Sequence, residues 1–140
     1  MSKATSRGFT LVELVVVITI LGILAAFAVP RFLALDGKAR EAALDGLAGS
    51  LRSAAALTHS LYLATGNTSP VAVEGASITM VNGYPNLATI DDALTDFTGF
   101  TYAPATGVFS KTGAPGVCTV TYAEAPANGQ PTVTVANGGC

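Results

Sequence analysis

The chain has 140 residues, of which 50% are hydrophobic and 11% are charged, with a mean hydropathy of +0.52 and a formal net charge of −2. This length allows one compact domain with one apolar segment beside it. The composition excludes intrinsic disorder, and the lack of excess Lys and Arg argues against nucleic-acid binding, because phosphates would meet no surplus of cations.

An apolar run follows a short basic start. Lys3 and Arg7 precede residues 9–29, and Glu13 is the only charged residue between positions 9 and 30. As a helix, these 21 residues extend about 31 Å, which matches the hydrocarbon core of a bilayer. Both flanks of the run are basic, so charge bias does not fix its orientation. The run therefore predicts one membrane-spanning helix.

Two other interpretations of this run stay open. One is a cleaved secretory signal peptide, with Ala26 and Ala28 as the small residues before a cleavage site at Val29. The other is a plain signal anchor that remains in the membrane. Glu13 argues against both, because an ionised carboxylate inside a membrane helix costs about 2 to 3 kcal/mol and neither kind of segment has a use for it.

A motif at positions 7–13 carries a family resemblance. It reads Arg-Gly-Phe-Thr-Leu-Val-Glu and is followed by an apolar run that contains Gly22 and Pro30. This pattern resembles the leader and N-terminus of type IV pilins and of the pseudopilins of type II secretion. The resemblance is strong over the N-terminal part and weaker beyond it, where residues 31–33, residues 83–85 and the late cysteine pair are similar to pilins of the mannose-sensitive haemagglutinin type.

The resemblance implies roles for three residues of the motif. A membrane peptidase would remove residues 1–8 by cutting between Gly8 and Phe9, and the same enzyme would methylate the new amine of Phe9. Glu13 of an incoming subunit would then meet the Phe9 amine of a neighbour and set the register of assembly, since charges in a low-dielectric bundle need counter-charges. The alternative, in which Glu13 bonds only to the amine of its own chain, stays open.

A second helical pattern continues beyond Pro30 to about Thr65. Its apolar face steps by three and four residues. The predicted positions on this face are Leu44, Leu47, Leu51, Ala54, Thr58 and Leu61. A helix of that total length, roughly 85 Å, is too long for so small a domain to bury, so its first half is expected to protrude. Gly22 and Pro30 weaken the helix between them, and we expect a kink there, which the resemblance extends to loss of helix in a filament.

Beyond Gly66, short runs of alternating apolar residues predict an antiparallel sheet of three to five strands. The expected strands are residues 78–81, 100–102, 108–109, 117–122 and 132–135, with turns at 104–107 and 127–129. The sheet is expected to pack on the apolar face of the helix. The predicted fold class is therefore α+β, a long N-terminal helix on a small antiparallel head.

The expected domain organisation has three parts. Residues 1–8 form a cleaved leader, and residues 9–35 form the protruding hydrophobic helix. Residues 36–140 form the globular head, which includes an amphipathic helix over 36–65 and a C-terminal region over 118–140 that is bounded by the two cysteines.

Other polar residues are weak candidates for chemistry. Thr89 is expected to cap a short helix whose first turn contains Asp91 and Asp92. These two carboxylates and Asp96 are candidate calcium ligands, but their spacing matches no known loop motif, so no metal site is expected. His59 has no second His or Cys nearby and is assigned to the helix surface. No catalytic set and no phosphate-binding loop is recognisable, so neither an enzyme nor a cofactor is expected.

Cys118 and Cys140 are the only two cysteines. In an exported protein such a pair predicts a disulfide, and many type IV pilins carry a C-terminal region bounded in this way. Two free thiols, buried as small apolar groups, are the alternative.

The function expected from these features is that of a structural subunit of a bacterial type IV pilus. The precursor would lie in the inner membrane, meet a prepilin peptidase and the assembly machinery, and polymerise into a helical surface filament for adhesion or motility. The alternatives are a type II secretion pseudopilin or minor pilin and, from another class, a membrane-anchored extracytoplasmic binding module.

The mature chain is expected to begin at Phe9, with a methylated amine. Gly8 has no side chain, which suits a peptidase that binds extended backbone closely. Mass spectrometry of the N-terminal peptide of protein taken from cells checks this. A mature chain that begins at Val29 would instead identify a signal peptide.

Overall fold

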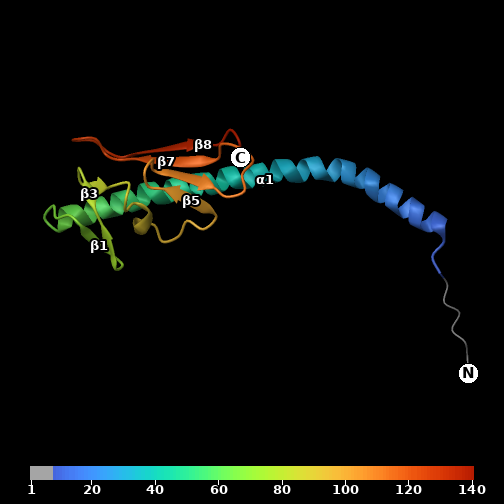
Figure 1. Ribbon diagram of the computed structural model, residues 1–140, viewed down its shortest axis with the longest axis horizontal. Helices are drawn as coiled ribbons and strands as arrows, with labels where there is room; N and C mark the ends of the chain where they lie inside the picture. Colours follow the sequence, from blue (N-terminus) through green and yellow to red (C-terminus); the bar gives the residue numbers. More distant parts are fainter. Residues whose placement is uncertain (1–7) are drawn as a thin grey trace, which may run out of the picture. The chain divides into compact units, whose positions relative to one another are not determined.

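The computed structural model describes residues 8–140 and has an α+β fold (Figure 1). One long helix, α1 (Leu11–Ala64), precedes small antiparallel sheets, as the sequence predicted. The chain divides into two compact units, one that ends at Gly37 and one that spans Lys38–Cys140. Lys3, Arg7 and the other leader residues up to position 7 lie outside the described residues.

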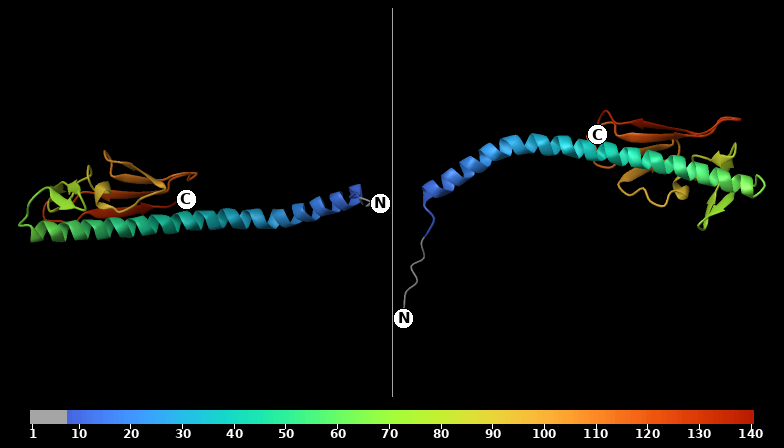
Figure 2. Two further views of the ribbon diagram at one scale, coloured as in Figure 1. Left: turned by 90° about the horizontal axis from the view of Figure 1, so that it is seen from below. Right: turned by 180° about the vertical axis from the view of Figure 1, so that it is seen from behind.

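Helix α1 runs without interruption through Gly22 and Pro30 (Figures 1 and 2). A proline removes a single helical hydrogen bond, and its cost of about 3 kcal/mol does not break α1 here. Loss of helix in this segment therefore stays a prediction. The helix ends in a Schellman motif, in which the Asn67 amide donates to the Tyr62 carbonyl (2.9 Å) and Gly66, at φ +77°, occupies the left-handed position.

The predicted apolar face of α1 forms the main core of the second unit. Leu44 and Leu51 are fully buried and Thr58 is almost so, but the buried alanine is Ala55 and not Ala54, and Leu61 is only half-buried. The full set of buried α1 residues is Leu44, Leu47, Ala48, Leu51, Ala55 and Thr58. Buried residues of the strands complete this core, namely Phe109, Val120 and Tyr122, together with Ile90 and Cys118, which lie outside the strands.

A four-stranded antiparallel sheet packs on this part of α1 (Figure 2). Its strands lie in chain order and are β5 (Phe100–Ala103), β6 (Val108–Lys111), β7 (Thr119–Ala123) and β8 (Thr132–Ala136). In β7 the side chains of Val120 and Tyr122 are buried while Thr119 and Thr121 are only partly covered. This alternation is the period of two from which the strand was predicted.

Two short hairpins precede this sheet, and they correct the single strand predicted over 78–81. In one, β1 (Val71–Val73) pairs with β2 (Ala76–Ile78); in the other, β3 (Met80–Val81) pairs with β4 (Tyr84–Pro85). The break falls at Thr79, whose amide donates to the Thr89 hydroxyl (3.1 Å) and not to a strand. Both hairpins are too short for an alternating pattern to predict them.

The short helix expected after Thr89 is also different from the prediction. The observed element is a single 3₁₀ turn, η1 (Asp91–Ala93), and it has no side-chain cap. Thr89 is unavailable as a cap because its hydroxyl donates to Asn86 Oδ1 (2.8 Å) and accepts from the Thr79 amide. A tertiary contact therefore outcompetes the local capping preference.

Two tyrosine hydroxyls join the large sheet to β4 and to the segment that follows it. The Tyr122 hydroxyl donates to the Pro85 carbonyl (2.7 Å), and the Tyr102 hydroxyl donates to the Leu87 carbonyl (2.5 Å). Burial, with smaller contributions from the carboxylates of Asp91 and Glu124, raises the pKa of Tyr102 to about 12. Burial likewise raises the pKa of Tyr122, so both side chains stay neutral and keep these bonds at ordinary pH.

A disulfide between Cys118 and Cys140 holds the C-terminal tail on the head. Cys118 belongs to the main core, and the Gly139 amide donates to the Val117 carbonyl (2.8 Å) beside the bond. Arg40 of α1 also donates to the Cys140 carbonyl (2.9 Å). The tail is thus attached to both the sheet and the helix.

Reduction of this disulfide is expected to lower the free energy of unfolding by about 3 kcal/mol, because the unfolded chain regains the entropy of an open loop. Chemical denaturation of the full-length protein in detergent, with and without reductant, measures this. A variant that carries both Cys118→Ala and Cys140→Ala is the control and should not respond to reductant. Two reactive thiols in denatured, unreduced protein would contradict the prediction.

Candidate functional site

The first turn of α1 is closed by a reciprocal pair of hydrogen bonds between Thr10 and Glu13. The Glu13 amide donates to the Thr10 hydroxyl oxygen (3.2 Å), while the Thr10 amide and hydroxyl donate to Glu13 Oε2 (2.9 and 2.8 Å). This is a capping box, in which two side chains satisfy amides that the helix leaves unpaired. Its sequence signature, Thr-x-x-Glu before an apolar run, is present at Thr10 and Glu13 and was not among the predicted features.

The predicted cleavage and assembly residues lie together at this end of the chain. Gly8, Phe9, Thr10 and Glu13 line one shallow hollow, and Gly8 has open space around the position of a Cβ atom. The peptide bond before Phe9 is intact in this chain, so Glu13 meets the amide and hydroxyl of Thr10 and no free amine. The roles assigned to Gly8, Phe9 and Glu13 therefore remain predictions.

An exposed apolar surface follows this turn. Seventeen large apolar side chains between Phe9 and Leu35 are exposed, among them Phe27 (73%) and Phe32 (70%). Within α1, the stretch nearest the N-terminus is long and apolar enough to cross a membrane, and none of it is buried. Such a surface is stable only when lipid or other protein covers it.

The other polar candidates are engaged in structural contacts. His59 lies at the edge of the head, where Nδ1 is 2.7 Å from the Gly83 carbonyl oxygen and the ring stacks on Tyr84. Asp96 Oδ1 accepts from the amide and hydroxyl of Thr98, and these bonds lower the pKa of Asp96. Among residues 8–140, no group of three His, Cys, Asp or Glu side chains is placed to hold a metal ion.

Residues 3–29 match the family model described as the prokaryotic N-terminal methylation motif. The N-terminal segment of this chain therefore resembles that of type IV pilins, as the motif predicted. The match covers the apolar run, its single carboxylate and the basic residues before them.

Several curated pilus proteins are similar to this chain over part of their length. The type IV narrow pilus major component PilA5 of Thermus thermophilus is 52% identical over 52 residues, which cover 37% of this chain and 45% of that protein. The type IV major fimbrial protein FimA of Dichelobacter nodosus is 49% identical over 45 residues, 32% and 27% of the two chains. The type IV major pilin protein PilA of Myxococcus xanthus is 47% identical over 36 residues, which cover 26% of this chain and 16% of that protein.

The similar segment spans less than half the length of each of these three relatives. No solved structure matches the chain significantly. The comparisons thus concern a limited segment of sequence, and the head is described from its own structure.

Replacing Thr10 with Val is expected to weaken the first turn of α1 by about 1 kcal/mol, because the Glu13 amide loses its acceptor. Amide hydrogen exchange at Glu13, measured on the full chain in detergent, should become about fivefold faster. Thr10→Ser keeps the hydroxyl and should exchange like the unchanged protein. Equal rates for the Val and Ser variants would show that the capping box does not stabilise this turn.

Proposed function

We propose that this chain is the precursor of a structural subunit of a bacterial type IV pilus. The observation that carries the proposal is the methylation motif over residues 3–29, followed by a helix whose apolar side chains are exposed. The proteins that resemble this segment are named as components of type IV pili. A pilus subunit needs such a helix twice, first in the membrane and then in the filament.

The apolar surface supplies the driving force for both states. Burial of a Val, Leu, Ile or Phe side chain is worth about 1.5 to 3 kcal/mol, so the surface between Phe9 and Leu35 represents on the order of 30 kcal/mol. Lipid would cover this surface in the inner membrane, and helices of other subunits would cover it in the filament. Transfer between two apolar surroundings changes little of this energy, which suits a subunit that leaves the membrane during assembly.

Glu13 would select the position of each subunit. It is the only charged residue between positions 9 and 30, so a misplaced subunit would bury this carboxylate without a counter-charge. Cleavage between Gly8 and Phe9 would create a cation one helical turn away, and the same cation on a neighbour would complete the pair. The capping box would hold the carboxylate until assembly.

The remaining site residues would adapt the subunit to the filament. Gly22 and Pro30 would let α1 lose helix locally, because Pro30 removes a helical hydrogen bond and Gly22 loses more backbone entropy in a helix than other residues do. The head would face outward, held by the Cys118–Cys140 disulfide, and this closed C-terminal region favours a pilin over a pseudopilin. The proposed role is structural and assigns no catalytic residue or cofactor.

The direct test of the proposal is to shear surface filaments from cells and identify their protein by mass spectrometry. We expect this chain in them, beginning at Phe9. Its absence from every surface filament, with the protein retained in the membrane, would favour a pseudopilin or an anchored binding module.

The assembly role of Glu13 predicts that Glu13→Ala leaves a folded, membrane-inserted protein but few filaments. Glu13→Gln is the matched control, since glutamine preserves a capping box but carries no charge. If charge sets the register, both variants fail to assemble, whereas assembly of the Gln variant alone would assign the defect to the cap. Wild-type numbers of filaments in the Ala variant would remove the charge mechanism. Filament yield and disulfide formation in the head are measured together.

A further inference from the structure

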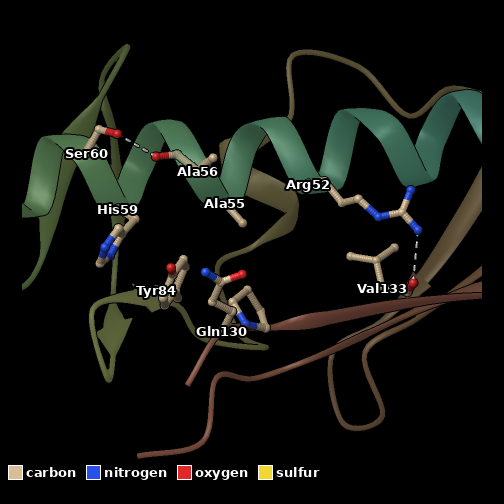
Figure 3. Close-up of a pocket in the computed structure, with 9 residues that line it drawn as sticks. Arg52, Ala55, Ala56, His59, Ser60, Tyr84, Gln130 and Val133 are labelled. Atoms are coloured by element: carbon tan, nitrogen blue, oxygen red, sulfur yellow. Dashed lines mark hydrogen bonds between the residues drawn. The ribbon is translucent and has the colours of Figure 1, made fainter. Parts of the chain in front are cut away.

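A groove with a volume of about 480 Å³ lies between α1 and the start of β8 (Figure 3). One wall is the α1 segment that carries Arg52 and His59, and the opposite wall carries Gln130 and Val133. Tyr84 closes one end, where its ring stacks on that of His59 at 4.2 Å. All of these residues belong to the unit Lys38–Cys140.

The groove is basic. Its lining includes the guanidinium group of Arg52 and no carboxylate. Arg52 donates through one nitrogen to the Val133 carbonyl (3.1 Å), which orients the group along the groove and leaves further N–H donors (Figure 3). The carbonyl oxygen of Gly83 can only accept a hydrogen bond, so Nδ1 of His59 is the donor in the bond between them. Arg52 and the amide of Gln130 thus provide donors for an anionic group.

A carboxylate is presented on a projecting turn of the same unit. Glu74 and Gly75 connect β1 and β2 as a two-residue hairpin turn, and Glu74 is exposed. The base of the hairpin is anchored by the buried side chains of Val71 and Ile78. Among the described residues, Glu74 makes no hydrogen bond or ion pair, so its charge is unmatched within the chain.

Glu74 is also an unusual residue for its backbone conformation. Its φ is +47°, and the other non-glycine residues with positive φ in the described chain are all asparagines, Asn67, Asn82 and Asn128. Asparagine tolerates this region, whereas a glutamate there costs conformational energy. Asn or Gly would therefore make the turn more stable than Glu does.

We propose that the Glu74 hairpin of one copy of this chain docks into the Arg52 groove of a second copy. The inference rests on the proposed function insofar as that function brings copies together. An exposed acidic turn complements in charge a groove that Arg52 lines without a carboxylate.

The placement of the two surfaces makes this contact self-propagating. In the view of Figure 1 the β1–β2 hairpin projects below α1 and β8 runs above it. The groove is lined by α1, by Tyr84 and by residues at the start of β8, so the hairpin turn and the groove are different surfaces of one copy. Each copy therefore contributes its hairpin to one neighbour and its groove to another. Such a heterologous contact produces an open chain of copies unless the copies close into a ring. Glu74 and Arg52 would thus fix the lateral register of neighbouring heads.

A zero-length cross-link tests this pairing in the full-length protein. Arg52→Lys supplies an amine that a carbodiimide reagent joins to a carboxylate in direct contact. Cells that contain both isotopically light and isotopically heavy copies of the chain are treated with the carbodiimide. The linked peptides are then identified in the membrane fraction and in filaments. We expect a link between positions 52 and 74 that joins a light chain to a heavy one. Combining Arg52→Lys with Glu74→Gln should abolish it.

Charge reversal provides the second measurement. Arg52→Glu and Glu74→Arg are each expected to lower filament yield about tenfold through like-charge repulsion, and the two together should restore it. Asp45→Arg is the matched control, because it reverses an exposed charge outside the groove. Glu41→Lys is less suitable, since Glu41 forms an ion pair with Lys38.

The outcomes separate this inference from the proposed function. Filaments that contain the chain but show no link between chains at positions 52 and 74 would overturn the hairpin contact and leave the pilus role intact. A link within one chain only, or from position 52 to a different protein, would also overturn it. A link between chains in membranes without any filament would support the contact while the proposed function failed.

Discussion

An apolar helical surface that cannot remain in water is the constraint on which this molecule depends. In the described part of the chain, the large apolar side chains between Phe9 and Leu35 are exposed. Beyond Lys38 the same helix buries Leu44 and Leu51 against the strands of the head. The first segment therefore needs covering from outside the chain, while the second is satisfied within it. One continuous helix thus carries an exposed apolar segment and a second segment that packs in the core of the head.

Charged residues are few in this chain, so each one has a large influence on which contacts are favourable. The carboxylate of Glu13 accepts hydrogen bonds from the amide and hydroxyl of Thr10 in the capping box, so it has hydrogen-bond partners within its own chain. In the head, Arg52 lines the groove and Glu74 lies on the turn between β1 and β2, and the two carry opposite charges. Isolated charges of this kind contribute little to the stability of one copy and much to the choice between alternative contacts.

The head is small, and it is held together by specific links as well as by its core. The Tyr122 hydroxyl binds a carbonyl of β4 and the Tyr102 hydroxyl binds one just after β4, and the disulfide attaches the tail to Cys118. The Leu87 amide donates to Glu124 (2.7 Å), which adds a further link between the same regions. Each link joins segments far apart in the sequence, and together they give short strands a defined position.

Local patterns in the sequence were sufficient to predict the apolar helix with its single carboxylate, the buried leucines, the strands of the large sheet and the cysteine pair. Each depends on composition or on a period of 3.6 or 2 that neighbouring residues display. The division of the strand at Thr79, the uncapped η1 and the groove that joins Arg52 to Tyr84 and Gln130 followed only from packing. These features arise from contacts between residues distant in the chain, whose hydrogen bonds outcompete local preferences and leave no periodic signal in the sequence.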